Sequence, residues 1–176
     1  PLVLWEGMGI AAELRPLGLP LVADFKVADI PSTNTMIAEA VFSAGFDGII
    51  CQGFPGPDSV GACVDLAHDH GGRCFVVAEM SHPGAPVFFS GGVPEKITAM
   101  AREAGADGII APATRPERVR ALREKAGDLL IWSPGVGAQG GDPGEIAGIV
   151  DGIIVGRAIT GAPDPAAQAH VYSRLC

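Results

Sequence analysis

Short apolar runs recur along the chain and divide it into similar units. Six runs of strand length lie within residues 19–26, 44–53, 71–80, 104–113, 127–135 and 147–156. None alternates cleanly between apolar and polar residues, which is typical of parallel strands that are buried on both faces. Three of them contain the tetrapeptide Asp-Gly-Ile-Ile, at 47–50, 107–110 and 151–154. The pattern predicts six parallel strands built from one repeated unit.

Segments with the period of an amphipathic helix separate these runs. A strand tail is expected over residues 1–4, a helix is expected to close the chain, and the other helices are expected over residues 4–18, 31–45, 58–72, 93–105 and 115–127. Strand and helix alternate without a polar linker between them. The sequence therefore predicts an α/β fold in a single domain that covers residues 1–176.

The number of units leaves two α/β architectures open. A closed (β/α)8 TIM barrel needs eight units and usually more than roughly 200 residues, whereas six complete strands are counted here. The repeated units favour a barrel whose N-terminal units are missing from this chain. An open α/β sheet is the alternative, because periodicity alone does not separate the two.

Composition and charge exclude several classes of function. The 176 residues carry a net charge of −8 and no basic run, which argues against nucleic acid or an anionic membrane as a partner. The longest apolar runs have the length of strands, so no segment is expected to span a membrane. Cys51, Cys63, Cys74 and Cys176 show no close pairing, which fits free thiols and a cytoplasmic location.

Charged residues stand at the end of the first strand, where an apolar run would be expected to continue. In an extended chain Asp24 and Lys26 project to the same face, because side chains alternate with a period of two. Asp29 follows, just before the helix that begins at Pro31. In a barrel the carboxyl ends of all strands open on one mouth, so these charges are candidates for chemistry.

Two later strand ends have the features of a phosphate site. Residues 133–144, "SPGVGAQGGDPG", supply glycine-rich backbone that can approach an anion closely. Residues 155–159, "VGRAI", add Arg157 and backbone N–H groups before the last helix. Loops after the last two strands of barrels often bind phosphate in this way. A phosphorylated substrate is therefore expected.

Five motifs in order carry a family resemblance over essentially the whole chain. They are "DFKVADIPST" (24–33), "EMSHPGA" (79–85), "TRPER" (114–118), "SPGVGAQGGDPGE" (133–145) and "IIVGRAI" (153–159). Together they resemble the orotidine 5′-phosphate decarboxylase family, and its archaeal branch in particular. The resemblance implies a (β/α)8 barrel that decarboxylates orotidine 5′-phosphate to UMP in pyrimidine biosynthesis. It also implies no cofactor, no metal, and a homodimer whose active sites are shared across the interface.

The resemblance also implies roles for individual residues. Asp24 and Lys26 match the catalytic pair, in which Lys26 donates a proton to C6, and Asp29 matches the aspartate that the other subunit contributes. The expected substrate-binding residues are Ile30 and Thr33 from the interface, Ser81 at the pyrimidine edge, and Pro134, Gln139, Gly156 and Arg157, the last three as the phosphate grip. Ile50, Val77 and Ile110 match an apolar pocket beside the scissile carboxylate.

The sequence departs from the family pattern at three positions. The family carries an Asp at the end of its first strand and a Lys late in its second, and nothing here matches either. Gln52 stands where archaeal relatives often carry His. The missing Asp and Lys leave open whether these 176 residues are active alone.

Two other functions remain alternatives at this point. A Mg²⁺-dependent sugar-phosphate decarboxylase or lyase of the same suprafamily shares the Asp-x-Lys-x-x-Asp pattern, although "DIPST" and "MSHPGA" favour the nucleotide enzyme. A non-catalytic phosphate-binding subunit is suggested only by the missing N-terminal units.

Overall fold

The computed structural model describes residues 2–175, which form two compact units. Unit 1 runs to Val77 and includes Glu103–Asp107, and unit 2 consists of Ala78–Arg102 and the chain from Gly108 onward. Both units alternate strands with helices, and the six expected strands are all present. The strand tail expected over residues 1–4 is wrong for the described part, since Leu2 begins a helix, and Pro1 lies outside the described residues, as does Cys176.

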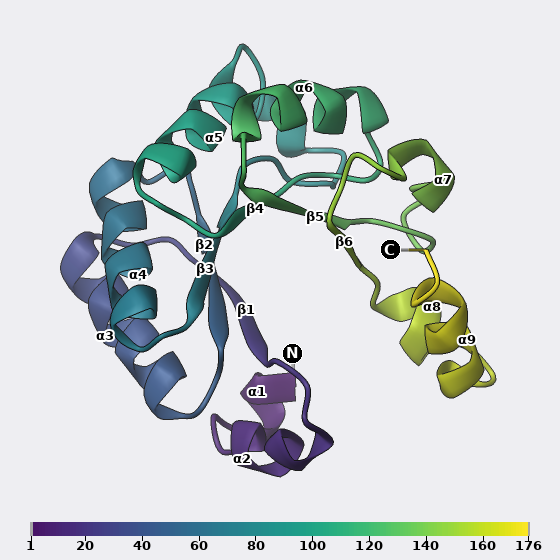
Figure 1. The fold of residues 1–176 in the computed structure, drawn as a ribbon, viewed down its shortest axis with the longest axis horizontal. Helices are drawn as coiled ribbons and strands as arrows, with labels where there is room; N and C mark the ends of the chain where they lie inside the picture. Colours follow the sequence, from purple (N-terminus) through teal and green to yellow (C-terminus); the bar gives the residue numbers. More distant parts are fainter. Residues whose placement is uncertain (1, 176) are drawn as a thin grey trace. The chain divides into compact units, whose positions relative to one another are not determined.

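Unit 1 is built around three parallel strands. Its elements are α1 (Leu2–Glu6), α2 (Ile10–Leu14), η1 (Arg15–Leu17), β1 (Val22–Val27), α3 (Pro31–Ser43), β2 (Gly48–Gln52), α4 (Pro57–Asp69) and β3 (Arg73–Val77). β2 pairs in parallel with both β1 and β3. Helices α3 and α4 pack against each other and against these strands (Figure 1). Ile49, Val60 and Phe75 have no exposed area and form part of the core.

The single helix expected over residues 4–18 is instead two short helices followed by a 3₁₀ turn. The break falls at Gly7, whose φ of 75° is a left-handed conformation that ends α1. Glycine adopts this conformation without the steric cost that a Cβ would bring. The periodicity of the apolar residues continues across the break, which is why the pattern alone did not reveal it.

Unit 2 repeats the arrangement with shorter strands. Its elements are η2 (Ala85–Val87), α5 (Val93–Glu103, whose last residue belongs to unit 1), β4 (Gly108–Ile110), α6 (Pro116–Ala126), β5 (Leu130–Pro134), α7 (Pro143–Ile146), β6 (Gly152–Ile154), α8 (Arg157–Thr160) and α9 (Pro165–Tyr172). β5 pairs in parallel with β4 and β6. Helix α6 packs on β5 and α7, and α8 packs on α9 (Figure 1).

The repeated Asp-Gly-Ile-Ile motif has a structural role at the start of the strands. In each copy the aspartate carboxylate accepts a hydrogen bond from a backbone N–H near the beginning of another strand. Asp47 accepts from Leu21 over 2.7 Å, Asp107 from Cys74 over 2.9 Å and Asp151 from Ile131 over 2.8 Å. Each of these aspartates also pairs with a basic side chain, respectively Arg15, His68 and Arg123. The hydrogen bonds of the motif therefore connect strands at their amino ends, and the candidate site residues lie at the carboxyl ends.

Candidate active site

The structure brings Asp24 and Lys26 together at the carboxyl end of β1. Lys26 Nζ lies 2.6 and 2.7 Å from the two carboxylate oxygens of Asp24. Both side chains keep part of their surface open, with 38% of Lys26 and 45% of Asp24 exposed. The two side chains therefore form a close ion pair that remains reachable from solvent.

A backbone irregularity presents this pair. The pairing of β1 with β2 slips between Ala23 and Val27, which is a β-bulge. Within the bulge Lys26 has a φ of 51°, and it is the one non-glycine residue with positive φ among residues 2–175. Such a conformation costs roughly 1–3 kcal/mol and persists only where the surroundings enforce it. Bulges are frequent next to active sites, where they redirect a side chain.

Asp29 lies in the short turn between β1 and α3, and its backbone is fixed by two buried side chains. Its N–H donates to Asn34 Oδ1 over 3.0 Å, and its carbonyl accepts the Ser59 hydroxyl over 2.8 Å. Asn34 Nδ2 donates to Ser59 Oγ over 2.7 Å, which joins the two. Asn34 has no exposed area and Ser59 has 2%, so the turn is held from inside unit 1.

The carboxylate of Asp29, in contrast, faces solvent. It accepts the N–H of the next residue, Ile30, over 2.7 Å. Ile30 is 63% exposed, and Thr33 in the first turn of α3 is half-buried. Sequence reasoning missed the roles of Asn34 and Ser59, although a polar residue on the apolar face of α3 is a signal that could have pointed to them.

In unit 2, Ser81 and Gln139 both lie close to Gly135, which follows β5 directly after Pro134. A Cβ on Gly135 would lie 3.4 Å from Gln139 Oε1 and 3.6 Å from Ser81 Cβ. Gly135 also has a φ of 100°, which favours glycine on its own account. The closest neighbour of such a Cβ would be Thr114 Cγ2 at 3.0 Å, so the lack of a side chain at Gly135 leaves room for Thr114, whereas Gln139 and Ser81 would lie at ordinary contact distance.

Gly156 and Arg157 lie where β6 gives way to the short helix α8. The carbonyl of Gly156 accepts the N–H groups of Ile159 and Thr160 over 2.8 and 3.0 Å, which starts that helix. Arg157 is its first residue and is exposed. The expectation that this segment precedes the last helix directly needs a correction. It forms a helix of its own, and α9 follows after a turn. Asp164 caps the start of α9, because its side chain accepts the N–H of Ala167.

The three expected apolar residues are all buried. Ile50 on β2 and Val77 on β3 belong to unit 1, whereas Ile110 on β4 belongs to unit 2, and each is 3% exposed or less. Gln52 is 6% exposed and pairs in register with Val77.

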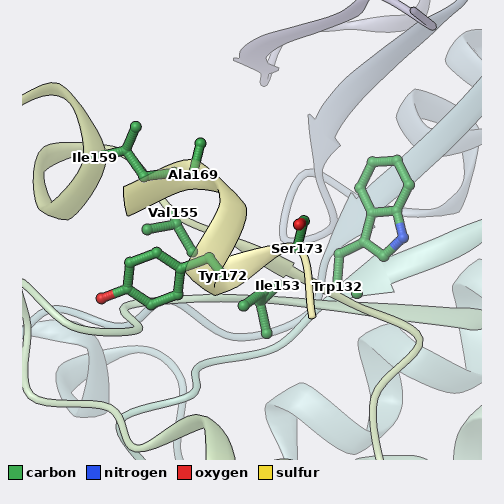
Figure 2. A pocket seen from close by; sticks show the side chains of 8 residues that line it. Trp132, Ile153, Val155, Ile159, Ala169, Tyr172 and Ser173 are labelled. Carbon is green, nitrogen blue, oxygen red and sulfur yellow. The ribbon is translucent and has the colours of Figure 1, made fainter. Parts of the chain in front are cut away.

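A hollow of about 430 Å³ lies in unit 2 beside β6 (Figure 2). Its walls are mainly apolar and come from β5, β6 and the last two helices: Trp132, Gly152, Ile153, Val155, Ile159, Ala169, Tyr172 and Ser173. None of the expected site residues lines it.

No group of three or more His, Cys, Asp and Glu side chains within residues 2–175 could hold a metal ion. No helix in the same range is both long enough and apolar enough to cross a membrane.

Comparison with known proteins supplies the family. Residues 1–172 match the model of the family described as "Orotidine 5'-phosphate decarboxylase / HUMPS family". A relative from Methanosarcina barkeri named orotidine 5′-phosphate decarboxylase is 54% identical over 172 residues, which is 97% of this chain and 77% of that protein. The protein of the same name from Pyrococcus furiosus is 46% identical over 168 residues, or 94% of this chain and 77% of that one.

The solved structures agree with the sequence matches. Orotidine 5′-monophosphate decarboxylase from Methanocaldococcus jannaschii, complexed with the inhibitor BMP, has a TM-score of 0.93 and 43% identity, and the match covers 98% of this chain and 81% of that one. The likeness confirms the predicted fold class, the (β/α)8 barrel, of which this chain spans about four fifths. The chain belongs to the orotidine 5′-phosphate decarboxylase / HUMPS family.

Proposed function

We propose that this chain decarboxylates orotidine 5′-phosphate to UMP, without a metal or an organic cofactor, as a step of UMP biosynthesis in the cytoplasm. The observation that carries the proposal is the Asp24–Lys26 ion pair, which a bulged, left-handed strand end holds partly open. It supports a decarboxylase because relatives that are 54% and 46% identical carry that name.

Lys26 is the proton donor in this proposal. When the bond between C6 and the carboxylate breaks, CO₂ leaves and its electron pair stays on C6 as a carbanion that no π-system can delocalise. A fixed cation stabilises that charge as it develops, and this electrostatic contribution is usually the largest in such catalysis. Lys26 then transfers a proton to C6, which gives UMP and a neutral amine. Asp24 orients the ammonium group throughout, since both its oxygens contact Nζ.

Asp29 is proposed to act in the site of a second subunit. Its backbone is locked and its carboxylate faces outward, as a contribution to a neighbour requires. Exposed apolar side chains lie close to it in sequence, with Ile30 63% and Met36 67% exposed. Apolar residues on a surface often mark an interface. Ile30 and Thr33 then contact the partner's substrate in a homodimer.

The residues of unit 2 are proposed to bind the rest of the nucleotide. Ser81 reads the edge of the pyrimidine, and Gln139 beside it reaches the phosphate together with Gly156 and Arg157. Pro134, the last residue of β5, leads into the turn at Gly135, near which both Gln139 and Ser81 lie. Binding energy from a phosphate remote from the reacting carbon can then lower the barrier at C6. The two sets of residues serve one reaction, in one barrel domain.

The test measures turnover of orotidine 5′-phosphate with EDTA present. Turnover is detected as a loss of the absorbance of the conjugated pyrimidine carboxylate. The full-length product of the gene is used, with Lys26→Ala as the matched control. We expect turnover that EDTA does not change and that the control lacks.

Two outcomes would overturn the proposal. Activity on a keto-sugar phosphate that EDTA abolishes would assign the chain to the Mg²⁺-dependent branch. Binding of UMP without turnover of either substrate would identify a non-catalytic phosphate-binding subunit.

A further inference from the structure

A buried carboxylate next to the predicted pyrimidine-reading loop has no role in the proposed reaction. Glu79 follows β3 by two residues, and only 2% of its side chain is exposed. Arg115 Nε donates to one of its oxygens and Arg118 Nε to the other, each over 3.0 Å. All three residues lie in unit 2. A carboxylate this deeply buried is tolerated because both oxygens are paired.

Arg118 extends the cluster to a second carboxylate. Its terminal nitrogen lies 2.9 Å from Glu95 Oε1 on helix α5. The hydrogen bond from Arg118 holds the pKa of Glu95 below its ordinary value, so Glu95 is negative at neutral pH. Two guanidinium groups then face two carboxylates, and the cluster is close to neutral. A buried ionic cluster of this kind is weak evidence for stability, because desolvation offsets most of the attraction.

Arg115 also contacts the backbone next to Ser81, which Arg118 does not. Its terminal nitrogen donates to the backbone carbonyl of Met80, the residue before Ser81. The neighbouring Thr114 hydroxyl donates to the carbonyl of Ser81 itself, over 3.3 Å. The carbonyls of two successive residues are therefore held from the turn between β4 and α6. Glu79 fixes the guanidinium that makes the first of these contacts.

We propose that Glu79 is a positioning residue for Ser81, acting through Arg115. The carboxylate sets the plane of the guanidinium, the guanidinium holds the Met80 carbonyl, and the Ser81 side chain is thereby kept close to Gly135, near which Gln139 also lies. A planar guanidinium suits this task, since its donors point in fixed directions. The inference rests on the proposed role of Ser81 in reading the pyrimidine.

The first test needs no substrate. Glu79→Gln keeps the size of the side chain and removes its charge, so the hold on Arg115 weakens. We expect amide hydrogen exchange over residues 80–84 to become about tenfold faster, as the loss of a charge-assisted hydrogen bond implies. Glu95→Gln is the matched control, because it removes the charge of the outer partner of Arg118 and leaves the contacts of Arg115 in place. Unchanged exchange over residues 80–84 in Glu79→Gln would overturn the proposal.

The second test is a double-mutant cycle on kcat/KM for orotidine 5′-phosphate. Glu79→Gln alone should lower kcat/KM by about tenfold or more. Combined with Ser81→Ala it should add little to the effect of Ser81→Ala, because both changes remove the same contact. Combined with Arg157→Ala the losses should multiply. Full additivity with Ser81→Ala would show that Glu79 acts only on the fold.

The two experiments together separate an error in the proposed role of Ser81 from an error in the proposed role of Glu79. If Ser81→Ala alone left kcat/KM unchanged while exchange in Glu79→Gln rose, the proposed role of Ser81 would be wrong, and the bracing of the loop by Glu79 would stand. If Glu79→Gln did not fold, Arg115→Lys would replace it in both experiments. Lysine keeps the charge but has no planar set of donors to reach Glu79 and Met80 together.

Discussion

Lys26 is a residue at which backbone strain and proposed catalysis can be separated by experiment. A left-handed backbone costs a residue with a Cβ roughly 1–2 kcal/mol, whereas glycine adopts it freely. The perturbation is therefore a pair of variants, Lys26→Ala and Lys26→Gly. Both lose the ammonium group and the ion pair to Asp24, so these losses cancel in the comparison. The pair differs only in whether residue 26 carries a Cβ at a φ of 51°.

The magnitude follows from two opposing contributions. Relief of strain favours the glycine variant by roughly 1–2 kcal/mol. The greater freedom of glycine in the unfolded chain offsets about 0.4–1 kcal/mol of that. The glycine variant should therefore be more stable than the alanine variant by about 0.5–1 kcal/mol. In a protein of this size that corresponds to a Tm about 1–4 °C higher.

The assay is thermal unfolding of both variants under identical conditions, followed by circular dichroism, together with turnover of orotidine 5′-phosphate. Both variants should retain less than about a hundredth of the parent rate, since a general acid contributes about 10²–10⁴-fold. A glycine variant that melts at or below the alanine variant would refute the assignment of strain to Lys26. A rate above that limit in either variant would refute its role as proton donor.

Three further predictions follow from the other parts of the site and from the fold. Arg157→Ala should mainly raise KM for the nucleotide and hardly affect turnover of a substrate without phosphate, and equal losses with both substrates would mean that Arg157 is structural. Lys26→Ala and Asp29→Ala homodimers should both be nearly inactive. Refolding an equal mixture should make about half of the dimers mixed and restore roughly a quarter of all sites. No recovery, with mixed dimers verified by mass spectrometry, would place Asp29 in its own chain's site. Asp47→Asn should make the protein less sensitive to acid, because the N–H of Leu21 and then Arg15 hold the pKa of Asp47 below its ordinary value. The stabilisation from this carboxylate is present above about pH 4 and lost as the pH falls further. Parallel urea unfolding of parent and variant between pH 7 and pH 3 measures it, and equal losses in the two would contradict the assignment.

Local pattern in the sequence was enough to predict most of the architecture. All six strands occur where the apolar runs lie, and the long helices α3, α4, α5 and α6 occupy the predicted amphipathic segments. Asp24 and Lys26 also lie together as predicted, although Lys26 has a left-handed backbone and not the extended one on which the prediction rested. The predictions of strands and helices succeeded because the period of a strand or helix depends on neighbouring residues alone.

Only the tertiary structure decided the contacts between residues that are far apart in the chain. Nothing near Lys26 in the sequence signals its left-handed backbone, which arises where β1 bulges against β2. Asn34 meets Ser59, and Glu79 meets Arg115, across 25 and 36 positions of sequence. The periodicity of a segment says which face is apolar and carries no information about which distant polar group that face will meet. Those pairings exist only once packing has brought the segments together, and they are the contacts that fix Asp29 and brace the loop of Ser81.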